Sequence, residues 1–182
     1  MLSIISDKLI DQKIPFCLIG AFALGFYGLP RHTVDIDFMV DINHWNKISK
    51  IISEAGYVCF QKTDIFAQFD SDYDIFGKVD LMFANSKTGR EMLQRSAFLS
   101  AELIGDIYVI QPSDYIILKL LAIANNKDRL LKDEYDISEF FKAHSKLGFS
   151  DKFEKLDISR IYNFAAKFRQ TDLIKKYLIK EI

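Results

Sequence analysis

The sequence contains few cysteines and histidines and no excess of positive charge. Its two cysteines, Cys17 and Cys59, both lie in apolar runs and lack the C-x-x-C spacing of a thiolate metal or redox site. The three histidines are scattered and form no metal motif. The formal net charge is only −1, so no global positive field would hold a long nucleic acid non-specifically. A cytoplasmic protein without disulfides fits these absences.

The sequence also lacks a long apolar run. The uncharged stretch 14–30 is the nearest candidate, but it falls short of the roughly 20 residues that a membrane span needs and contains Pro15 and three glycines. The first residues have no basic segment before their apolar ones, so they do not resemble a signal peptide. We therefore expect no membrane partner.

What the sequence does contain is material for a core. Hydrophobic residues make up 49% of the 182, with 16 Phe and 8 Tyr, which argues for a globular chain of one domain or of one domain with a small partner. The hydrophobic patterns predict an α+β fold, with a mixed α and β part over 1–111 and a helical part over 112–182. The expected helices are 2–13, 21–27, 41–56, 88–95, 113–125, 129–145, 152–168 and 171–181, and the expected strands are 16–19, 33–40, 57–61, 65–69, 78–83, 98–103 and 107–110.

Three aspartates interrupt apolar strands and are candidate metal ligands. Asp35 and Asp37 stand two residues apart in the expected strand 33–40, so both would project from one face with Cα atoms about 6.5 Å apart. Asp80 lies within the apolar run 79–83. Neighbouring carboxylates repel each other and lose hydration, and a divalent cation removes both penalties. Such oxygen ligands suit Mg²⁺ or Mn²⁺.

Each aspartate also has an interpretation without function. Asp35 and Asp37 would equally suit a solvent-exposed polar face or an Asx turn, and Asp80 an edge-strand charge that discourages aggregation. A rival acidic group, Asp70, Asp72 and Asp74, begins like a calcium-binding EF-hand loop. It lacks the glycine and glutamate that such a loop requires later, so a hydrated turn at 70–72 is the better prediction.

A second candidate feature is the glycine turn at Gly20-Ala21. It follows a short apolar strand and opens a helix, which would direct backbone N–H groups towards a bound phosphate. Close packing of strand and helix explains the same pattern about as often.

Together these motifs resemble the signature of the DNA polymerase β-like nucleotidyltransferase superfamily. Gly20-Ala21, thirteen intervening residues and Asp35-Ile36-Asp37 match its glycine turn and Asp-x-Asp, and Asp80 matches its third carboxylate. Ala21 stands where Gly or Ser is usual and offers only its backbone N–H. The fuller string, with Tyr27-Gly28 and 31–37, resembles the AbiEii branch, which includes toxins of toxin–antitoxin systems. It is also similar to small lincosamide-type antibiotic nucleotidyltransferases.

The resemblance implies a fold and a reaction. The fold is a mixed β-sheet core with flanking helices, followed by a C-terminal helical part. The reaction is transfer of a nucleoside monophosphate from a nucleoside triphosphate (NTP) to an acceptor hydroxyl, with Mg²⁺ or Mn²⁺ held by Asp35, Asp37 and Asp80. The acceptor would be RNA, for example a tRNA 3′ end, or a protein, and an antitoxin would be the partner of a toxin. The resemblance assigns nucleotide binding to Gly20, Ala21, Arg31, Thr33, Lys119, Arg129, Asp133 and Asp136.

Alternatives to these assignments remain open at the level of sequence. Lys119, within a nearly all-apolar helix, could reach out to water instead of binding phosphate. Arg129 with Asp133, and Lys132 with Asp136, have the spacing of ordinary helix salt bridges. A small-molecule antibiotic acceptor differs only in what receives the nucleotide. A non-catalytic nucleotide-binding module is a further alternative.

Overall fold

The computed structural model describes residues 1–178, apart from the side chains at 74 and 145–147. The chain forms two compact units. The first contains Met1–Phe26 and Pro30–Ile110, and the second contains Tyr27–Leu29 and the chain from Gln111 onward. No helix within the described part combines the length and the apolarity needed to cross a membrane.

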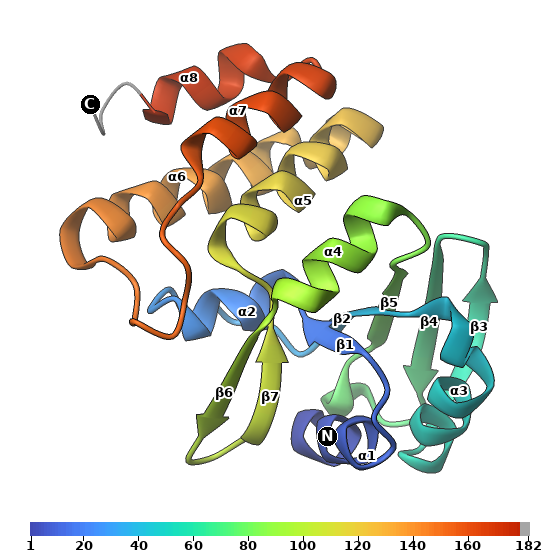
Figure 1. Ribbon diagram of the computed structural model, residues 1–182. Coiled ribbons are helices and arrows are strands. Elements are labelled where there is room, and N and C mark those ends of the chain that lie inside the picture. The colour runs from blue at the N-terminus through green and yellow to red at the C-terminus, as the bar shows by residue number, and fades with distance from the viewer. Residues whose placement is uncertain (179–182) are drawn as a thin grey trace. The chain divides into compact units, whose positions relative to one another are not determined.

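The first unit is built on a mixed seven-stranded sheet (Figure 1). The strand order is β3-β4-β5-β2-β1-β7-β6, with β2 parallel to β5 and β1 parallel to β7, while the other neighbours are antiparallel. This arrangement confirms the α+β prediction. The strands are β1 Phe16–Leu18, β2 Ile36–Val40, β3 Tyr57–Lys62, β4 Phe66–Ser71, β5 Val79–Phe83, β6 Ala97–Ala101 and β7 Gly105–Val109.

Helices α1 and α3 pack side by side in this unit (Figure 1), and α3 covers one face of the sheet. The ring of Trp45 on α3 lies 6.0 Å from that of Phe69 on β4 and 5.8 Å from that of Phe83 on β5. Lys8 of α1 pairs with Glu54 of α3 at 2.9 Å. The helices of the unit are α1 Leu2–Asp11, α2 Gly20–Phe26, α3 Trp45–Glu54 and α4 Lys87–Arg95, with short 3₁₀ turns η1 Ile42–His44 and η2 Asp74–Phe76.

Successive side chains of a strand lie on alternate faces of the sheet, and this decides which of them lie on the face opposite α3. On β5, Val79, Leu81 and Phe83 are buried, whereas Asp80 between them is only partly covered. Because successive side chains point to opposite faces of a sheet, Asp80 lies on the face away from Trp45. The polar residues of the neighbouring strands follow the same alternation.

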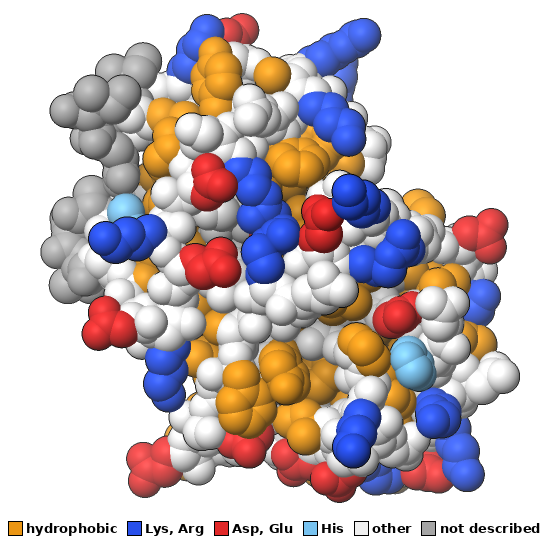
Figure 2. All heavy atoms as spheres, viewed as in Figure 1, with side chains coloured by type: hydrophobic (Ala, Val, Ile, Leu, Met, Phe, Trp, Pro, Cys, Tyr) orange, Lys and Arg blue, Asp and Glu red, His pale blue; other side chains and the backbone are white. Residues whose placement is uncertain are grey.

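Hydrophobic side chains reach the surface over β6 and β7 (Figure 2). Phe98 on β6 and Tyr108 on β7 are exposed, and their ring centroids are 5.1 Å apart. Elsewhere on the face that Figure 2 shows, basic and acidic side chains are intermixed. The small net charge is therefore spread on this face as mixed signs and not as one basic patch.

Two strand boundaries differ from those predicted. Strand β2 begins at Ile36 and not at 33. Immediately before it, the Asp35 side chain accepts a hydrogen bond from the Lys78 backbone N–H. The turn predicted at 70–72 is wrong in part, since Asp70 and Ser71 belong to β4 and pair with β3. The rest of that acidic group includes Asp74, whose side chain lies outside the described residues.

The hairpin of β6 and β7 and the late helices also differ in detail. The hairpin turns at 102–104, and Gly105, at φ +84°, already begins β7. The helix predicted over 152–168 begins only at Ile158, because Asp157 accepts a hydrogen bond from the Arg160 N–H and caps it. The last predicted helix is described to Leu178, and residues 179–181 lie outside the described residues.

The second unit consists of helices around an aromatic cluster. Its elements are α5 Pro112–Asn125, the 3₁₀ turn η3 Lys127–Arg129, α6 Leu130–Leu147, α7 Ile158–Lys167 and α8 Thr171–Leu178. Tyr27 contributes to the cluster, with ring centroids 5.7 Å from Tyr115, 5.4 Å from Phe140 and 5.0 Å from Phe153. Aromatic pairs at these distances are favourable beyond their buried area. These contacts explain why Tyr27–Leu29 belongs to this unit, although the sequence placed it with the first.

Candidate functional site

Asp37 and Asp80 are the central pair of the candidate site. They stand directly opposite each other in the register of the parallel strands β2 and β5, whose Cα atoms are about 4.8 Å apart between neighbouring strands. Both side chains lie on the sheet face away from α3, and both are only partly buried. The structure thus brings together two of the three predicted carboxylates.

Asp35 is placed differently from the prediction. It lies just before β2 and is exposed, whereas Asp37 lies within β2 and is partly buried. Its Oδ1 accepts a hydrogen bond from the Lys78 backbone N–H at 2.9 Å, two residues before Asp80. Within the described part of the chain, no three or more His, Cys, Asp or Glu side chains form a group that could hold a metal ion.

Gly20 lies directly against the Asp37 carboxylate. Its φ of +65° is one that residues with a side chain rarely adopt, and a Cβ built on it would overlap Oδ2 and Cγ of Asp37. The Ile19 N–H donates to the Asp37 carbonyl at 2.9 Å. The predicted glycine turn and the predicted Asp-x-Asp strand therefore meet, and only glycine fits at their contact.

The other residues of this region that the sequence singled out lie on α2 and in the segment before β2. Ala21 is buried in the first turn of α2, whereas Arg31 is exposed in the segment between α2 and β2. Thr33, in the same segment, donates a hydrogen bond from Oγ1 to the Asp35 carbonyl at 3.4 Å. This segment has no regular secondary structure and leads directly to the carboxylates.

Gln68 is a member of the site that the sequence did not reveal. It lies on β4 opposite Asp80 on β5, and its Nε2 donates a hydrogen bond to Asp80 Oδ1 at 3.0 Å. No sequence motif marks it. The only available signal was alternation along β4, which places Gln68 between the buried Ala67 and Phe69.

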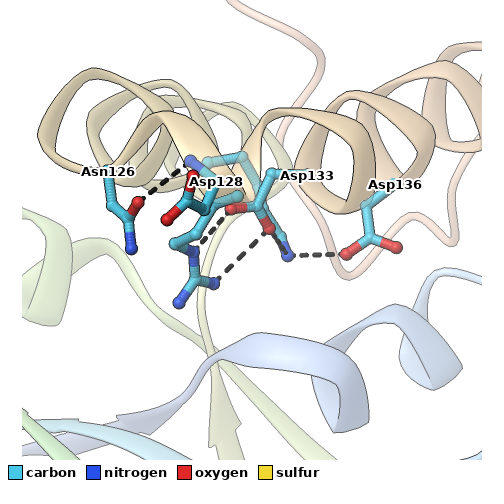
Figure 3. Close-up of polar contacts among 6 residues, drawn as sticks. Asn126, Asp128, Asp133 and Asp136 are labelled. Carbon is cyan, nitrogen blue, oxygen red and sulfur yellow. Dashed lines mark hydrogen bonds and ion pairs between the residues drawn. The ribbon is translucent and has the colours of Figure 1, made fainter.

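In the second unit, a buried ion-pair network surrounds Lys119 (Figure 3). The ammonium Nζ of Lys119 on α5 lies 2.7 Å from Asp133 Oδ1 and 2.6 Å from Asp136 Oδ2, both on α6. The Lys119 side chain is only 9% exposed, so the alternative that it reaches out to water is wrong. Buried charges of this kind are tolerated because they are paired and hydrogen-bonded.

Arg129 extends the network towards solvent. Its Nε donates to Asp133 Oδ2 at 2.8 Å, and its side chain is 48% exposed, so the predicted i,i+4 salt bridge forms. Burial disfavours the charged form of Asp133, but hydrogen bonds and positive charge from Arg129 and Lys119 outweigh it and hold the pKa of this carboxyl below its usual value. The structure therefore brings together four of the predicted nucleotide-binding residues as one network within the second unit.

The sequence has no match among known family profiles and none among curated proteins. Solved structures do match. The antibiotic-resistance factor ANT(2'')-Ia superposes with a TM-score of 0.61 at 15% identity, over 98% of this chain and 94% of that one. A putative nucleotidyltransferase from Thermotoga maritima gives 0.53 at 19% identity, over 73% and 89%.

A third match is the lincosamide antibiotic adenylyltransferase LnuA in its lincomycin-bound form, with a TM-score of 0.53 at 15% identity, over 74% of this chain and 90% of that one. At such identities the likeness establishes the fold alone. The chain thus has a polymerase β-like nucleotidyltransferase fold, in agreement with the fold that the resemblance implied.

Proposed function

We propose that the protein is a Mg²⁺-dependent nucleotidyltransferase that transfers a nucleoside monophosphate from an NTP to an acceptor hydroxyl. The observation that supports this most strongly is the direct pairing of Asp37 with Asp80, with Gly20 packed against Asp37. Two partly covered carboxylates placed side by side repel each other. A divalent cation relieves that repulsion, and a nucleotide supplies the remaining oxygen ligands.

The donor set fits Mg²⁺ or Mn²⁺. In nucleotide-dependent enzymes, Mg²⁺ is usually held by one or two carboxylates together with substrate phosphates and water, and not by a complete protein cage. Asp37 and Asp80 meet this requirement. Asp35, held near them by its hydrogen bond to Lys78, would be a third ligand. When bound, the metal would neutralise charge on the phosphates and lower the pKa of the attacking oxygen.

The chain's own residues would then act as follows. Asp35 and Asp37 would hold the triphosphate through its metal, and Asp80 would help to hold a second metal and would orient the acceptor hydroxyl and accept its proton. The acceptor oxygen attacks the α-phosphorus, the bond between that phosphorus and the β-bridging oxygen breaks, and pyrophosphate leaves. The close contact of Gly20 with Asp37 keeps side chains out of the space beside the carboxylate, so the backbone at Gly20 and Ala21 can approach the phosphates.

Further nucleotide contacts are proposed from the resemblance. Arg31 and Thr33 lie in the segment that leads to the carboxylates and would contact phosphate oxygens. In the second unit, Lys119, Arg129, Asp133 and Asp136 would contribute as one network. Of these, Arg129 is best suited to direct contact, because its side chain is half exposed and already oriented by Asp133.

For the acceptor, we propose RNA, for example a tRNA 3′ end, or a protein. Because the motifs resemble the AbiEii branch, which includes toxins of toxin–antitoxin systems, we propose an antitoxin as partner. A second candidate is a small antibiotic. Its support is the superposition on ANT(2'')-Ia over nearly the full length of both chains, together with that on LnuA.

The test is transfer of label from each of four α-³²P NTPs, with Mg²⁺ or Mn²⁺, into RNA, protein, tobramycin and lincomycin. Wild type is compared with Asp37→Asn, and with Asp106→Asn as a matched control in the same sheet. Labelled product from wild type and the control, but not from Asp37→Asn, supports the proposal and identifies the acceptor. Tight Mg²⁺-nucleotide binding without product from any acceptor would instead favour a non-catalytic nucleotide-binding module.

A further inference from the structure

A row of four polar residues crosses the sheet face away from α3. Asp37 on β2 pairs with Asp80 on β5, Asp80 pairs with Gln68 on β4, and Gln68 pairs with Gln61 on β3. Directly opposite residues on neighbouring strands share one face of a sheet. The row therefore continues from the two carboxylates to two amides, and only the inner amide, that of Gln68, is hydrogen-bonded to a carboxylate, at 3.0 Å.

We infer that Gln68 is a positioning residue that fixes the orientation of the Asp80 carboxylate for metal binding and proton transfer. This inference rests on the function proposed above, because it gives Asp80 those two roles. Partners of this kind, which hold a metal ligand in place, commonly alter metal affinity or activity by about 10- to 100-fold when removed. Neither the family resemblance nor the Asp-x-Asp motif assigns a role to Gln68.

The direction of the hydrogen bond follows from the chemistry of the two groups. An ionised carboxylate can only accept hydrogen bonds, so the amide must present its NH₂ group to Asp80 Oδ1. This donor holds one carboxylate oxygen at a defined place on the sheet. A Gln side chain opposite Asp80 in an antiparallel pair needs no backbone distortion to do so.

The amide is also the side chain that does this without changing the charge of the site. A Lys or Arg at position 68 would hold Asp80 as well, but its positive charge would compete with a divalent cation for the carboxylate. A carboxylate at 68 would repel Asp80 across the strand pair. A neutral donor avoids both effects, which is the requirement for a group that orients a metal ligand.

The sheet supplies a matched control for the test. Gln68→Met keeps a side chain of similar length but removes the donor, and Gln61→Met makes the same change one strand further out, on an exposed residue. Binding of Mn²⁺ alone is measured by electron paramagnetic resonance for the wild-type chain and both variants, and thermal unfolding checks that each is folded. Nucleotidyl transfer is then measured with the NTP and acceptor that wild type uses.

We expect Gln68→Met to weaken Mn²⁺ binding by about 10- to 100-fold, and Gln61→Met to change it less than about 2-fold, since surface substitutions of this kind have small effects. In transfer, kcat should fall for Gln68→Met while KM for the NTP stays near the wild-type value, because the hydrogen bond orients the acceptor side. If Gln68→Met does not fold, Gln68→Asn, which keeps the amide but loses its reach, serves as the second variant and should weaken binding in the same direction.

The outcomes separate this inference from the proposed function. Wild-type Mn²⁺ affinity and kcat in a folded Gln68→Met variant would overturn the role of Gln68 and leave the nucleotidyltransferase intact. Equal losses in Gln68→Met and Gln61→Met would also overturn it, because the effect would then belong to the sheet face as a whole. A wild-type chain that neither binds Mn²⁺ nor transfers label would refute the proposed function, and the role of Gln68 with it.

Discussion

The contact between Gly20 and Asp37 gives a prediction whose size follows from the structure. In Gly20→Ala, the new side chain must adopt a φ near +65°, which costs about 1–2 kcal/mol for an L-residue. The new Cβ would also overlap Oδ2 and Cγ of Asp37 and lie 2.8 Å from its Cβ. Relief of such overpacking typically costs a further 1–3 kcal/mol or so. The expected loss is therefore about 2–5 kcal/mol in the free energy of unfolding.

Gly56→Ala is the matched control, because Gly56 has a φ of +91° and nothing within 4 Å of the Cβ position. It should lose only the conformational part, about 1–2 kcal/mol. Both variants are measured by urea unfolding. Asp37→Ala removes the two atoms that the new methyl group would meet most closely, so the double variant Gly20→Ala/Asp37→Ala should lose less than the sum of the two single losses.

Gly20→Ala should also impair metal binding and activity in the variant that remains folded. The carboxylate must move to admit the methyl group, and a displacement of about 1 Å at a reacting centre can cost 100-fold in rate. Mn²⁺ binding should weaken in Gly20→Ala but not in Gly56→Ala. Equal unfolding free energies for the two variants, together with strict additivity in the double variant, would refute the reasoning.

Three further predictions concern the ion-pair network around Lys119 and a second glycine, Gly77, that is packed closely against the backbone. Lys119→Met leaves the buried carboxylates of Asp133 and Asp136 without their shared ammonium, so urea unfolding should show a loss of about 3–5 kcal/mol. The pKa of Asp133 is lowered on folding. The ionised Asp133 side chain therefore contributes its full stability above about pH 4, the usual pKa of Asp, and this contribution is lost as the pH falls through the lower folded pKa. In an acid titration followed by circular dichroism, the stability of Asp133→Asn should fall less steeply with pH than that of the wild type. Gly77→Ala should destabilise the first unit, because Gly77 has a φ of +60° and its Cβ would overlap the Val34 carbonyl; thermal unfolding that is unchanged would contradict this.

Much of the fold could be predicted because apolar periodicity is local. Each predicted strand and helix within the described residues has a counterpart, and Asp80 was identified because it interrupts an otherwise apolar β5. That Gly20 and Asp37 belong to one site was implied by the family resemblance, which did not give their direct contact. The alternation of side chains along a strand and the ending of strands and helices at glycine can both be seen within a few residues of sequence.

The rest depended on contacts between distant segments. Asp35 was expected on the strand face, but its side chain binds the Lys78 backbone N–H, 43 residues away. The pairing of Gln68 with Asp80 depends on the register of β4 against β5, which no local pattern specifies. Helical spacing predicted that Arg129 would pair with Asp133. It could not show that the Lys119 ammonium, on α5, would lie between Asp133 and Asp136 of α6.

The position of Tyr27 has a consequence for how the chain is made and divided. During synthesis, the segment Tyr27–Leu29 emerges early, yet the rings of Tyr115, Phe140 and Phe153 that surround Tyr27 emerge much later. The helical unit therefore cannot complete its aromatic cluster until Phe153 has been translated, and its long-range contacts should make it slow to form. A fragment that starts at Gln111 would lack one ring of its own interior, so co-expression with a peptide that carries Tyr27 should rescue it.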